Sequence, residues 1–265
     1  MYKNYHTHTY RCKHAQGDVN DYAKVAIDNK VAVLGFSDHT PLPDNRWTDV
    51  RMELQELGGY ISAIESTQID FPQLTILKGM ECEFADEYAG FYKDELLGRL
   101  KFDYIIAGAH YYPLNGDWVS SYNGSMEKYQ LKAYAEYVVR AINSGLFAFI
   151  AHPDLFGSAY EQWDRNAASC SRYILEAAQD MKVPLEINGY GLRKPKRTTP
   201  EGMRSMYPWM QFWELAAEYD IRVVMNSDAH KPSDVTANID EACSIARRYG
   251  LKAADLSYLE KGRKA

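Results

Sequence analysis

The sequence predicts an α/β fold with a parallel sheet of seven strands, and three observations support this prediction. Short apolar runs alternate with longer amphipathic segments, which is the pattern of repeated βα units. Histidine and acidic residues follow the ends of the apolar runs. The chain has 265 residues, of which 46% are hydrophobic, so it can bury a sizeable core. We therefore expect one domain over residues 1–265.

The expected strands are buried apolar runs that end in polar residues. Residues 31–37 are a clear case, because Val-Ala-Val-Leu-Gly-Phe-Ser runs directly into Asp38 and His39. Residues 104–109 form a similar run that ends in His110. In chain order the seven expected strands are residues 2–7, 31–37, 74–80, 104–109, 146–151, 183–187 and 221–227.

Helices are expected where apolar residues recur at spacings of three and four. Asp18 or Asn20 can cap a helix over residues 18–30, and Gly145 suits the C-terminal end of a helix over residues 125–144. The stripe expected on that second helix consists of Tyr129, Ala133, Tyr137 and Ala141. The other expected helices are residues 49–68, 92–100, 168–181, a segment with Trp209, Phe212, Trp213 and Ala216 facing inward, and 238–249.

Three of the seven histidines lie between positions 6 and 14. On a strand, alternate side chains share a face, so His6 and His8 point the same way. Two neutral imidazoles on one face can hold one metal ion near neutral pH. By itself, a His-x-His pair is equally typical of a solvated strand end.

The remaining candidate ligands lie at or just after the C-terminal ends of predicted strands. A single histidine after an apolar run is more often a hydrogen-bonded core residue, but several independent placements favour a site with several metal ions. In a barrel of parallel strands these ends converge on one face, where active sites are built. A nitrogen-rich ligand set favours zinc, iron or manganese over magnesium. The residues are His39, Glu81, His110, His152, Asp228 and His230, with His14 in the first loop.

Composition bounds the partners and the compartment. The net charge of −6 and pI near 5.7 argue against a broad nucleic-acid-binding surface, so we expect no nucleic-acid partner. The four cysteines lie far apart without a C-x-x-C spacing, as ordinary reduced thiols do. The N-terminus lacks the apolar run of a signal peptide, and no apolar stretch is long enough to span a membrane. We expect a cytoplasmic protein without a membrane partner.

In a set of ordered motifs, the sequence resembles the PHP (polymerase and histidinol phosphatase) superfamily, and within it the histidinol-phosphate phosphatase branch. The resemblance spans about residues 4–250, and it implies a distorted, TIM-like (β/α)7 barrel with its active site at the C-terminal ends of the strands. The motifs are His6-Thr7-His8-Thr9 with His14-Ala15, Gly35-Phe36-Ser37-Asp38-His39, Gly79-Met80-Glu81, His110, Ala151-His152-Pro153-Asp154 and Asn226-Ser227-Asp228-Ala229-His230.

The resemblance also implies a site for three divalent metal ions, with zinc, iron or manganese as candidates. The first ion is expected between His6, His8, Glu81 and Asp228. Glu81 is expected to bridge to a second ion, held by His110 and His152. The third is expected between His14, His39 and His230.

The implied activity is hydrolysis of L-histidinol phosphate, a small phosphomonoester of histidine biosynthesis, to L-histidinol and inorganic phosphate. Adjacent metal ions can activate a shared water and neutralise phosphate oxygens, so we expect direct attack by metal-bound hydroxide. Glu81 is expected to take part as the bridging carboxylate. Asp228 or His230 is the expected acid for the leaving group.

Substrate selection is expected just past the sixth strand. Arg193 and Arg197 belong to a basic run that is either a solvated loop or a phosphate-binding element. Asn188 lies at the same rim, and Glu83 is one candidate for the substrate's amine. Asp38 and Asp154 each adjoin a candidate ligand, and the sequence leaves open whether they orient an imidazole or cap a loop.

Two other interpretations remain. One keeps the metal mechanism but assigns a nucleotide phosphoesterase or nuclease of the same superfamily. The other is a metal-stabilised module without catalysis, which the complete set of nine candidate ligands disfavours.

Overall fold

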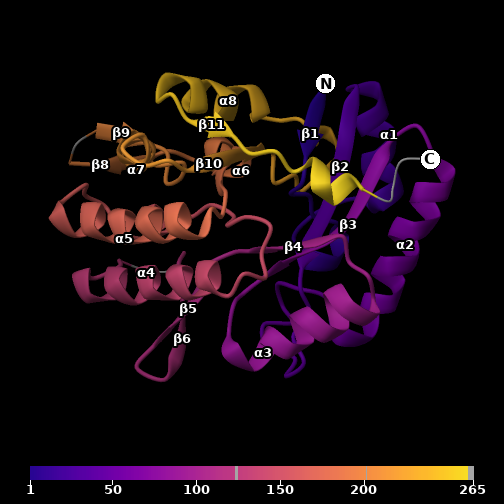
Figure 1. Ribbon diagram of the computed structural model, residues 1–265, viewed down its shortest axis with the longest axis horizontal. Helices are drawn as coiled ribbons and strands as arrows, with labels where there is room; N and C mark the ends of the chain where they lie inside the picture. The colour runs from indigo at the N-terminus through magenta and orange to yellow at the C-terminus, as the bar shows by residue number, and fades with distance from the viewer. Residues whose placement is uncertain (123–124, 201, 262–265) are drawn as a thin grey trace. The chain divides into compact units, whose positions relative to one another are not determined.

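A parallel sheet at the start of the chain supports most of the candidate ligands. In the computed structural model, which describes residues 1–122, 125–200 and 202–261, the strands lie in the order β1, β2, β3, β4 (Figure 1). These strands are Tyr2–Asn4, Val31–His39, Thr75–Cys82 and Tyr104–Ala107. The pairs β1–β2 and β2–β3 are parallel, and the register of the second pair places His39 beside Glu81.

The chain divides into two compact units, each of which is described by itself. Unit 1 comprises Met1–Ile106, Asn226–Ile239 and Asp255–Ala265, and unit 2 comprises Ala107–Met225 and Asp240–Ala254. The expectation of a single domain over residues 1–265 stays a prediction.

Unit 1 surrounds its sheet with helices whose starts follow the local sequence. Asp18 caps the first helix by accepting a hydrogen bond from the Val19 backbone, and Asp21 completes a capping box. The helices are η1 (Tyr10–Cys12), α1 (Val19–Asp28), η2 (Leu54–Glu56), α2 (Leu57–Asp70), α3 (Asp86–Gly90), the π-helix η3 (Phe91–Arg99), η5 (Pro232–Asp234) and η6 (Ser257–Glu260).

Tyr104 on β4 packs across the neighbouring strands where they lack side chains. A Cβ atom on Gly35 or Gly79 would overlap the Tyr104 ring or its hydroxyl group. The hydroxyl donates a 2.7 Å hydrogen bond to the carbonyl of Tyr5. The two glycines therefore fix where the large ring sits between β1, β2 and β3.

Unit 2 contains a smaller parallel sheet and two hairpins. Its strands are β5 (Tyr111–Leu114), β6 (Asp117–Ser120), β7 (Leu185–Asn188), β8 (Arg197–Thr199), β9 (Gly202–Arg204), β10 (Arg222–Asn226) and β11 (Lys252–Ala253). The sheet order is β11, β10, β7, and the hairpins are β5–β6 and β8–β9. Its helices are α4 (Lys128–Asn143), η4 (Leu155–Ser158), α5 (Arg165–Met181), α6 (Gly189–Arg193), α7 (Met210–Ala216) and α8 (Ile239–Arg248).

Most of the predicted elements are present, with three corrections. Residues 146–151 form no strand, because only Ile150 pairs, through isolated bridges to Ala107 and Leu185. The hairpins were not predicted. On α4 the predicted stripe is partly wrong, because Tyr129 is exposed and the buried residues include Leu131, Tyr134 and Val138. The helices α4 and α5 pack side by side (Figure 1).

Candidate metal centre

Four predicted ligands of the first metal ion converge within unit 1. His6 Nε2 lies 3.1 Å from His8 Nε2. Glu81 Oε2 lies 3.3 Å and 3.4 Å from these two nitrogens, and Asp228 Oδ1 lies 3.5 Å and 3.2 Å from them. All four side chains are buried. The structure therefore brings together the residues that the sequence predicted for this ion.

Five of the six distances between these four atoms are close to the separation of ligand atoms around a tetrahedral metal ion. A regular tetrahedron with an edge of about 3.3 Å has its centre about 2.0 Å from each corner, which is the length of a zinc–nitrogen or zinc–oxygen bond. Two imidazole nitrogens and two carboxylate oxygens are also ligand types that zinc, iron and manganese accept. The residues present thus fit a divalent metal ion.

Asn4, which sequence reasoning missed, helps to hold the first and last parts of this group together. Its Nδ2 donates hydrogen bonds to Thr7 Oγ1 at 3.0 Å and to Ser227 Oγ at 3.1 Å. Its Oδ1 accepts hydrogen bonds from the backbones of His6 and Ser227. A parallel bridge between Thr7 and Ala229 places the two ligand-bearing segments side by side. In the sequence, Asn4 is only a polar residue shortly before His-x-His, and nothing there indicates that its amide is buried and hydrogen-bonded.

Glu81 occupies a position from which it can serve two ions. Its Oε2 also lies 3.1 Å from His39 Nδ1, on the neighbouring strand. The same oxygen therefore lies near ligands that were assigned to the first ion and to the third ion, whereas its predicted bridge to the second ion stays a prediction.

A second group of imidazoles lies beside the first. His14 Nε2 and His230 Nε2 are 3.1 Å apart, while their Nδ1 atoms lie 2.7 Å from the Cys12 carbonyl and 3.1 Å from the Asp228 carbonyl. A carbonyl accepts hydrogen bonds only, so both Nδ1 atoms are placed to donate, and Nε2 is the atom that each neutral imidazole would offer to a metal ion.

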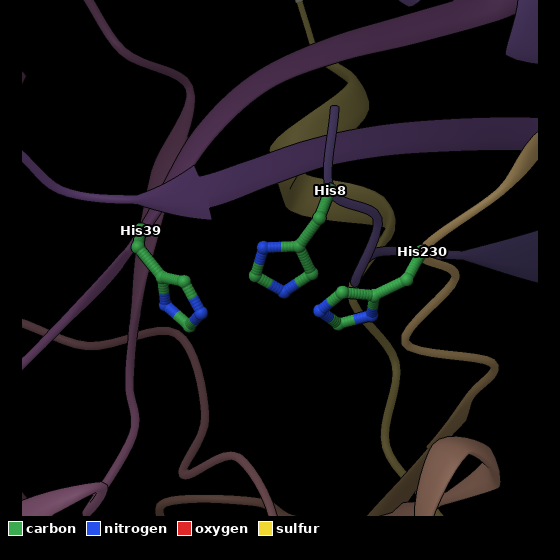
Figure 2. Close-up of side chains that lie close together, drawn as sticks. All are labelled: His8, His39 and His230. Atoms are coloured by element: carbon green, nitrogen blue, oxygen red, sulfur yellow. The ribbon is translucent and has the colours of Figure 1, made fainter. Parts of the chain in front are cut away.

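His39 lies close to the same group. Figure 2 shows that the rings of His8, His39 and His230 gather in one place, and their ligand atoms lie within 4.8 Å of one another. Cys12 is a further potential ligand beside His14 and His230, which its spacing in the sequence did not indicate.

The neighbouring histidines shift the pKa values of Asp228 and His230. Burial raises the pKa of Asp228, but the nearby His6, His8 and His230 outweigh it and hold the pKa well below its usual range. Burial and the positive charge of His8 lower the pKa of His230 well below its usual value. An ionised carboxylate and a neutral imidazole suit metal ligands better than a general acid, so the role of either residue as the acid stays a prediction without support from these shifts.

The two aspartates next to candidate ligands have different roles. Asp38 Oδ1 lies 3.6 Å from His8 Nδ1, and its Oδ2 accepts a 3.0 Å hydrogen bond from the Thr9 backbone, so Asp38 can orient an imidazole. Asp154 Oδ2 accepts hydrogen bonds from the Trp209 backbone and from Trp213 Nε1. Asp154 therefore anchors the start of α7.

Unit 2 holds the other two predicted ligands. The rings of His110 and His152 have centroids 4.9 Å apart, and both residues are buried. The backbone N–H of His152 donates to Glu186 Oε2 at 3.1 Å. The predicted second ion requires Glu81 from unit 1 together with this pair, and it stays a prediction.

The predicted substrate-binding residues differ in how they are already engaged. Asn188 is buried, donates to Glu186 Oε2 at 2.8 Å and accepts from the Gly191 backbone at 3.0 Å, so its amide caps α6. Arg197 donates to Glu161 Oε1 at 2.5 Å and to the Ser158 carbonyl at 2.6 Å. Their substrate contacts, like that of Arg193, stay predictions.

Glu83 is not available for the substrate's amine in this structure, because it is fully buried and forms a 2.8 Å ion pair with buried Arg51. Arg51 also donates to the Thr40 carbonyl at 2.9 Å, and Thr40 N donates to the Glu81 carbonyl at 2.8 Å. This pair therefore links the loop after β2 to the end of β3, which carries Glu81.

Comparison with known proteins decides the family. Residues 4–189 match the PHP domain. The chain belongs to the PHP family. Among the curated proteins, a relative from Deinococcus radiodurans named a probable histidinol-phosphatase is 31% identical over 252 residues, which cover 92% of each chain. The predicted PHP superfamily, histidinol-phosphatase branch, is confirmed.

Two solved structures show the fold of this PHP domain. A candidate histidinol phosphatase from Listeria monocytogenes is 21% identical, with a TM-score of 0.73 over 90% of this chain and 99% of that chain. A histidinol phosphate phosphatase from Lactococcus lactis, solved with zinc, L-histidinol and phosphate, is 15% identical, with a TM-score of 0.75 over 97% of each chain. The predicted α/β fold class of the distorted barrel type is confirmed. Among the described residues of this PHP domain, no helix is long and apolar enough to cross a membrane.

Proposed function

We propose that the chain is a metal-dependent phosphomonoesterase that hydrolyses L-histidinol phosphate to L-histidinol and inorganic phosphate. The observation that carries this proposal is the convergence of four buried ligand atoms from His6, His8, Glu81 and Asp228, at distances of 3.1–3.5 Å. The relatives named above supply the choice of substrate. We further propose three divalent metal ions, a cytoplasmic location and a role in histidine biosynthesis.

The residues of the chain prepare the site for this chemistry. Bound divalent ions would activate a water molecule and neutralise the phosphoryl oxygens. The pKa of Asp228 lies well below its usual range beside His6 and His8, so the carboxylate is ionised and available as a ligand at neutral pH. Asp38 places a carboxylate oxygen 3.6 Å behind Nδ1 of His8, and the ion pair between Arg51 and Glu83 holds the end of the strand that carries Glu81.

The proposal is tested by phosphate release from L-histidinol phosphate, measured beside a panel of nucleotide and sugar phosphates with the protein's metals quantified. We expect a preference for L-histidinol phosphate of about 100-fold in kcat/KM, which corresponds to about 2.7 kcal/mol of transition-state discrimination. Equal or faster turnover of a nucleotide would instead favour the phosphoesterase or nuclease alternative.

Metal removal separates an enzyme from a metal-stabilised module. We expect a chelator to abolish activity while near-ultraviolet circular dichroism still shows packed aromatic residues, and zinc, manganese or iron to restore turnover. Unfolding at the same chelator concentration that removes activity would favour the structural module.

Direct hydrolysis has a stereochemical consequence. With a chiral phosphate ester in labelled water, one in-line attack inverts the configuration at phosphorus. Retention would indicate two displacements and a covalent intermediate, and would contradict this part of the proposal.

A further inference from the structure

The charged side chains of the basic segment at residues 193–197 lie in different surroundings. Arg197 is paired with Glu161, and Lys196 is exposed. Lys194 instead lies half-buried among three tyrosine rings of unit 2. Its Nζ lies 4.5 Å from the centroid of Tyr122, 4.8 Å from that of Tyr190 and 5.5 Å from that of Tyr207. We call these three rings the tyrosine cage.

The cage holds a positive charge in a defined place. An ammonium group over an aromatic face is attracted by the ring quadrupole, by about 0.5–1 kcal/mol at an exposed site and more when water is displaced. Three rings around one nitrogen also replace part of its hydration shell. Because the ammonium is then less screened by water, its attraction to an anion that reaches the cage is stronger than that of a freely solvated lysine.

Two rings of the cage also contact the candidate ligands of unit 2. The Tyr122 ring stacks on His110 with centroids 6.1 Å apart, and the Tyr207 ring meets the edge of His152 at 5.7 Å. His110 and His152 are themselves neighbours. The Lys194 ammonium is thus one aromatic ring away from each of the two imidazoles that are predicted to hold a metal ion.

Local packing fixes this arrangement. Gly191 lies directly against Tyr207, and any Cβ atom there would overlap both the Tyr207 carbonyl and its ring. Asn188 caps α6 through the Gly191 backbone, and Lys194 directly follows the last residue of α6, with its backbone N–H donating to the carbonyls of Tyr190 and Gly191. The direction of the Lys194 side chain therefore follows from the short helix and the ring beneath it.

We propose that Lys194, held by the tyrosine cage, binds the phosphoryl group of the substrate on the side of His110 and His152, in place of Arg197. The proposal rests on the proposed function, because it assumes that a phosphate ester enters this site. A dianionic phosphoryl group would then be shared between the metal-binding imidazole pair and the caged ammonium.

Equilibrium binding of inorganic phosphate to the metal-loaded protein tests this, measured by isothermal titration calorimetry. We expect Lys194→Met to weaken phosphate binding by about tenfold or more, since a hydrogen bond to a charged group is lost. Lys194→Arg should restore most of the affinity. Lys196→Met is the matched control, because it removes an equal charge from an exposed position two residues away, and it should leave the affinity unchanged.

Inhibition by L-histidinol identifies which end of the substrate the cage serves. We expect the inhibition constant of L-histidinol to be the same in Lys194→Met and wild type. A Lys194→Met protein that binds phosphate normally but binds L-histidinol differently would overturn the proposal, because the cage would then receive the organic end of the substrate. Undetectable phosphate binding to the wild type would overturn it as well.

The rings provide a second test. Tyr190→Phe keeps a ring and should bind phosphate as the wild type does, whereas Tyr190→Leu removes one and should weaken binding by about threefold. Equal binding by both variants would contradict the role of the cage.

The two proposals fail separately. Phosphate binding that depends on Lys194, without turnover of L-histidinol phosphate, would refute the proposed function alone. Normal turnover of L-histidinol phosphate, together with equal phosphate binding by wild type and Lys194→Met, would refute the present proposal alone.

Discussion

Asp38 Oδ1 lies 3.6 Å from Nδ1 of His8, thirty positions away in the chain, while His8 Nε2 faces Glu81 and Asp228. A carboxylate behind a metal-binding imidazole fixes the ring and increases its basicity. Thr9 holds the other oxygen of Asp38 through both its backbone N–H and its hydroxyl group. Asp38 therefore lies beside His8 and Thr9, although in the chain it precedes His39.

Asp38→Asn should therefore weaken metal binding while leaving the fold intact. The asparagine keeps the size of the side chain and can still accept hydrogen bonds from Thr9, but it loses the negative charge behind His8. We expect metal affinity to fall about 10- to 100-fold, measured by competition with a chromogenic chelator. Asp28→Asn, at the exposed end of α1, is the control. Unchanged affinity in Asp38→Asn would contradict the role assigned to it.

The buried ion pair between Arg51 and Glu83 should show strong coupling. Removing either partner leaves an uncompensated buried charge, so Arg51→Met and Glu83→Gln should each lower the free energy of unfolding by about 3–5 kcal/mol. The double variant Arg51→Met, Glu83→Gln should lose much less than the sum of the two single changes. Urea unfolding measures all three, and additive losses would show that the two charges act independently.

Gly79 should tolerate no side chain, because a Cβ atom there overlaps the ring of Tyr104. We expect Gly79→Ala to lower the free energy of unfolding by about 1–3 kcal/mol through overpacking. Gly58→Ala on α2 is the matched control, since a Cβ atom there meets open space, and it should stabilise the protein by about 0.5–1 kcal/mol. Adding Tyr104→Leu to Gly79→Ala should recover part of the loss, and no recovery would place the strain elsewhere.

Asp154 should make stability depend on pH. Burial raises its pKa to about 6, and hydrogen bonds from Trp209 and Trp213 only partly oppose this. The unfolded carboxyl titrates near its ordinary pKa of about 3.9, so between about pH 4 and pH 6 the folded state binds more protons than the unfolded state. Its contribution is therefore fully present below pH 4 and is lost as pH rises through 6, by about 3 kcal/mol in all.

Asp154→Asn removes this titration but can still accept both hydrogen bonds. We expect the free energy of unfolding of the variant, relative to wild type, to increase between pH 4 and pH 7, as followed by urea unfolding at each pH. A difference that does not change with pH would show that the folded-state pKa is close to its ordinary value.

Much of the fold could be predicted from the sequence, because helices and strands are specified largely by residues that are neighbours in the chain. The apolar run from Val31 to Ser37 and the capping aspartate at position 18 specify their elements through neighbours in the chain, and both elements formed as predicted. The predicted strand at residues 146–151 was wrong because pairing depends on residues far away in the chain. Their apolar character reflects burial, but a strand also needs a partner in register, and only Ile150 has one.

For the site, the sequence alone determined which residue types are available and that they follow strand ends, and its resemblance to the PHP superfamily implied the grouping of His6, His8, Glu81 and Asp228. Only the tertiary structure decided which partners the other charged residues contact. Asp38 serves His8, Glu83 is neutralised by Arg51, Arg197 pairs with Glu161, and Lys194 lies in the tyrosine cage. Each of these depends on where a side chain ends in space, and electrostatic attraction acts on that distance and not on separation along the chain.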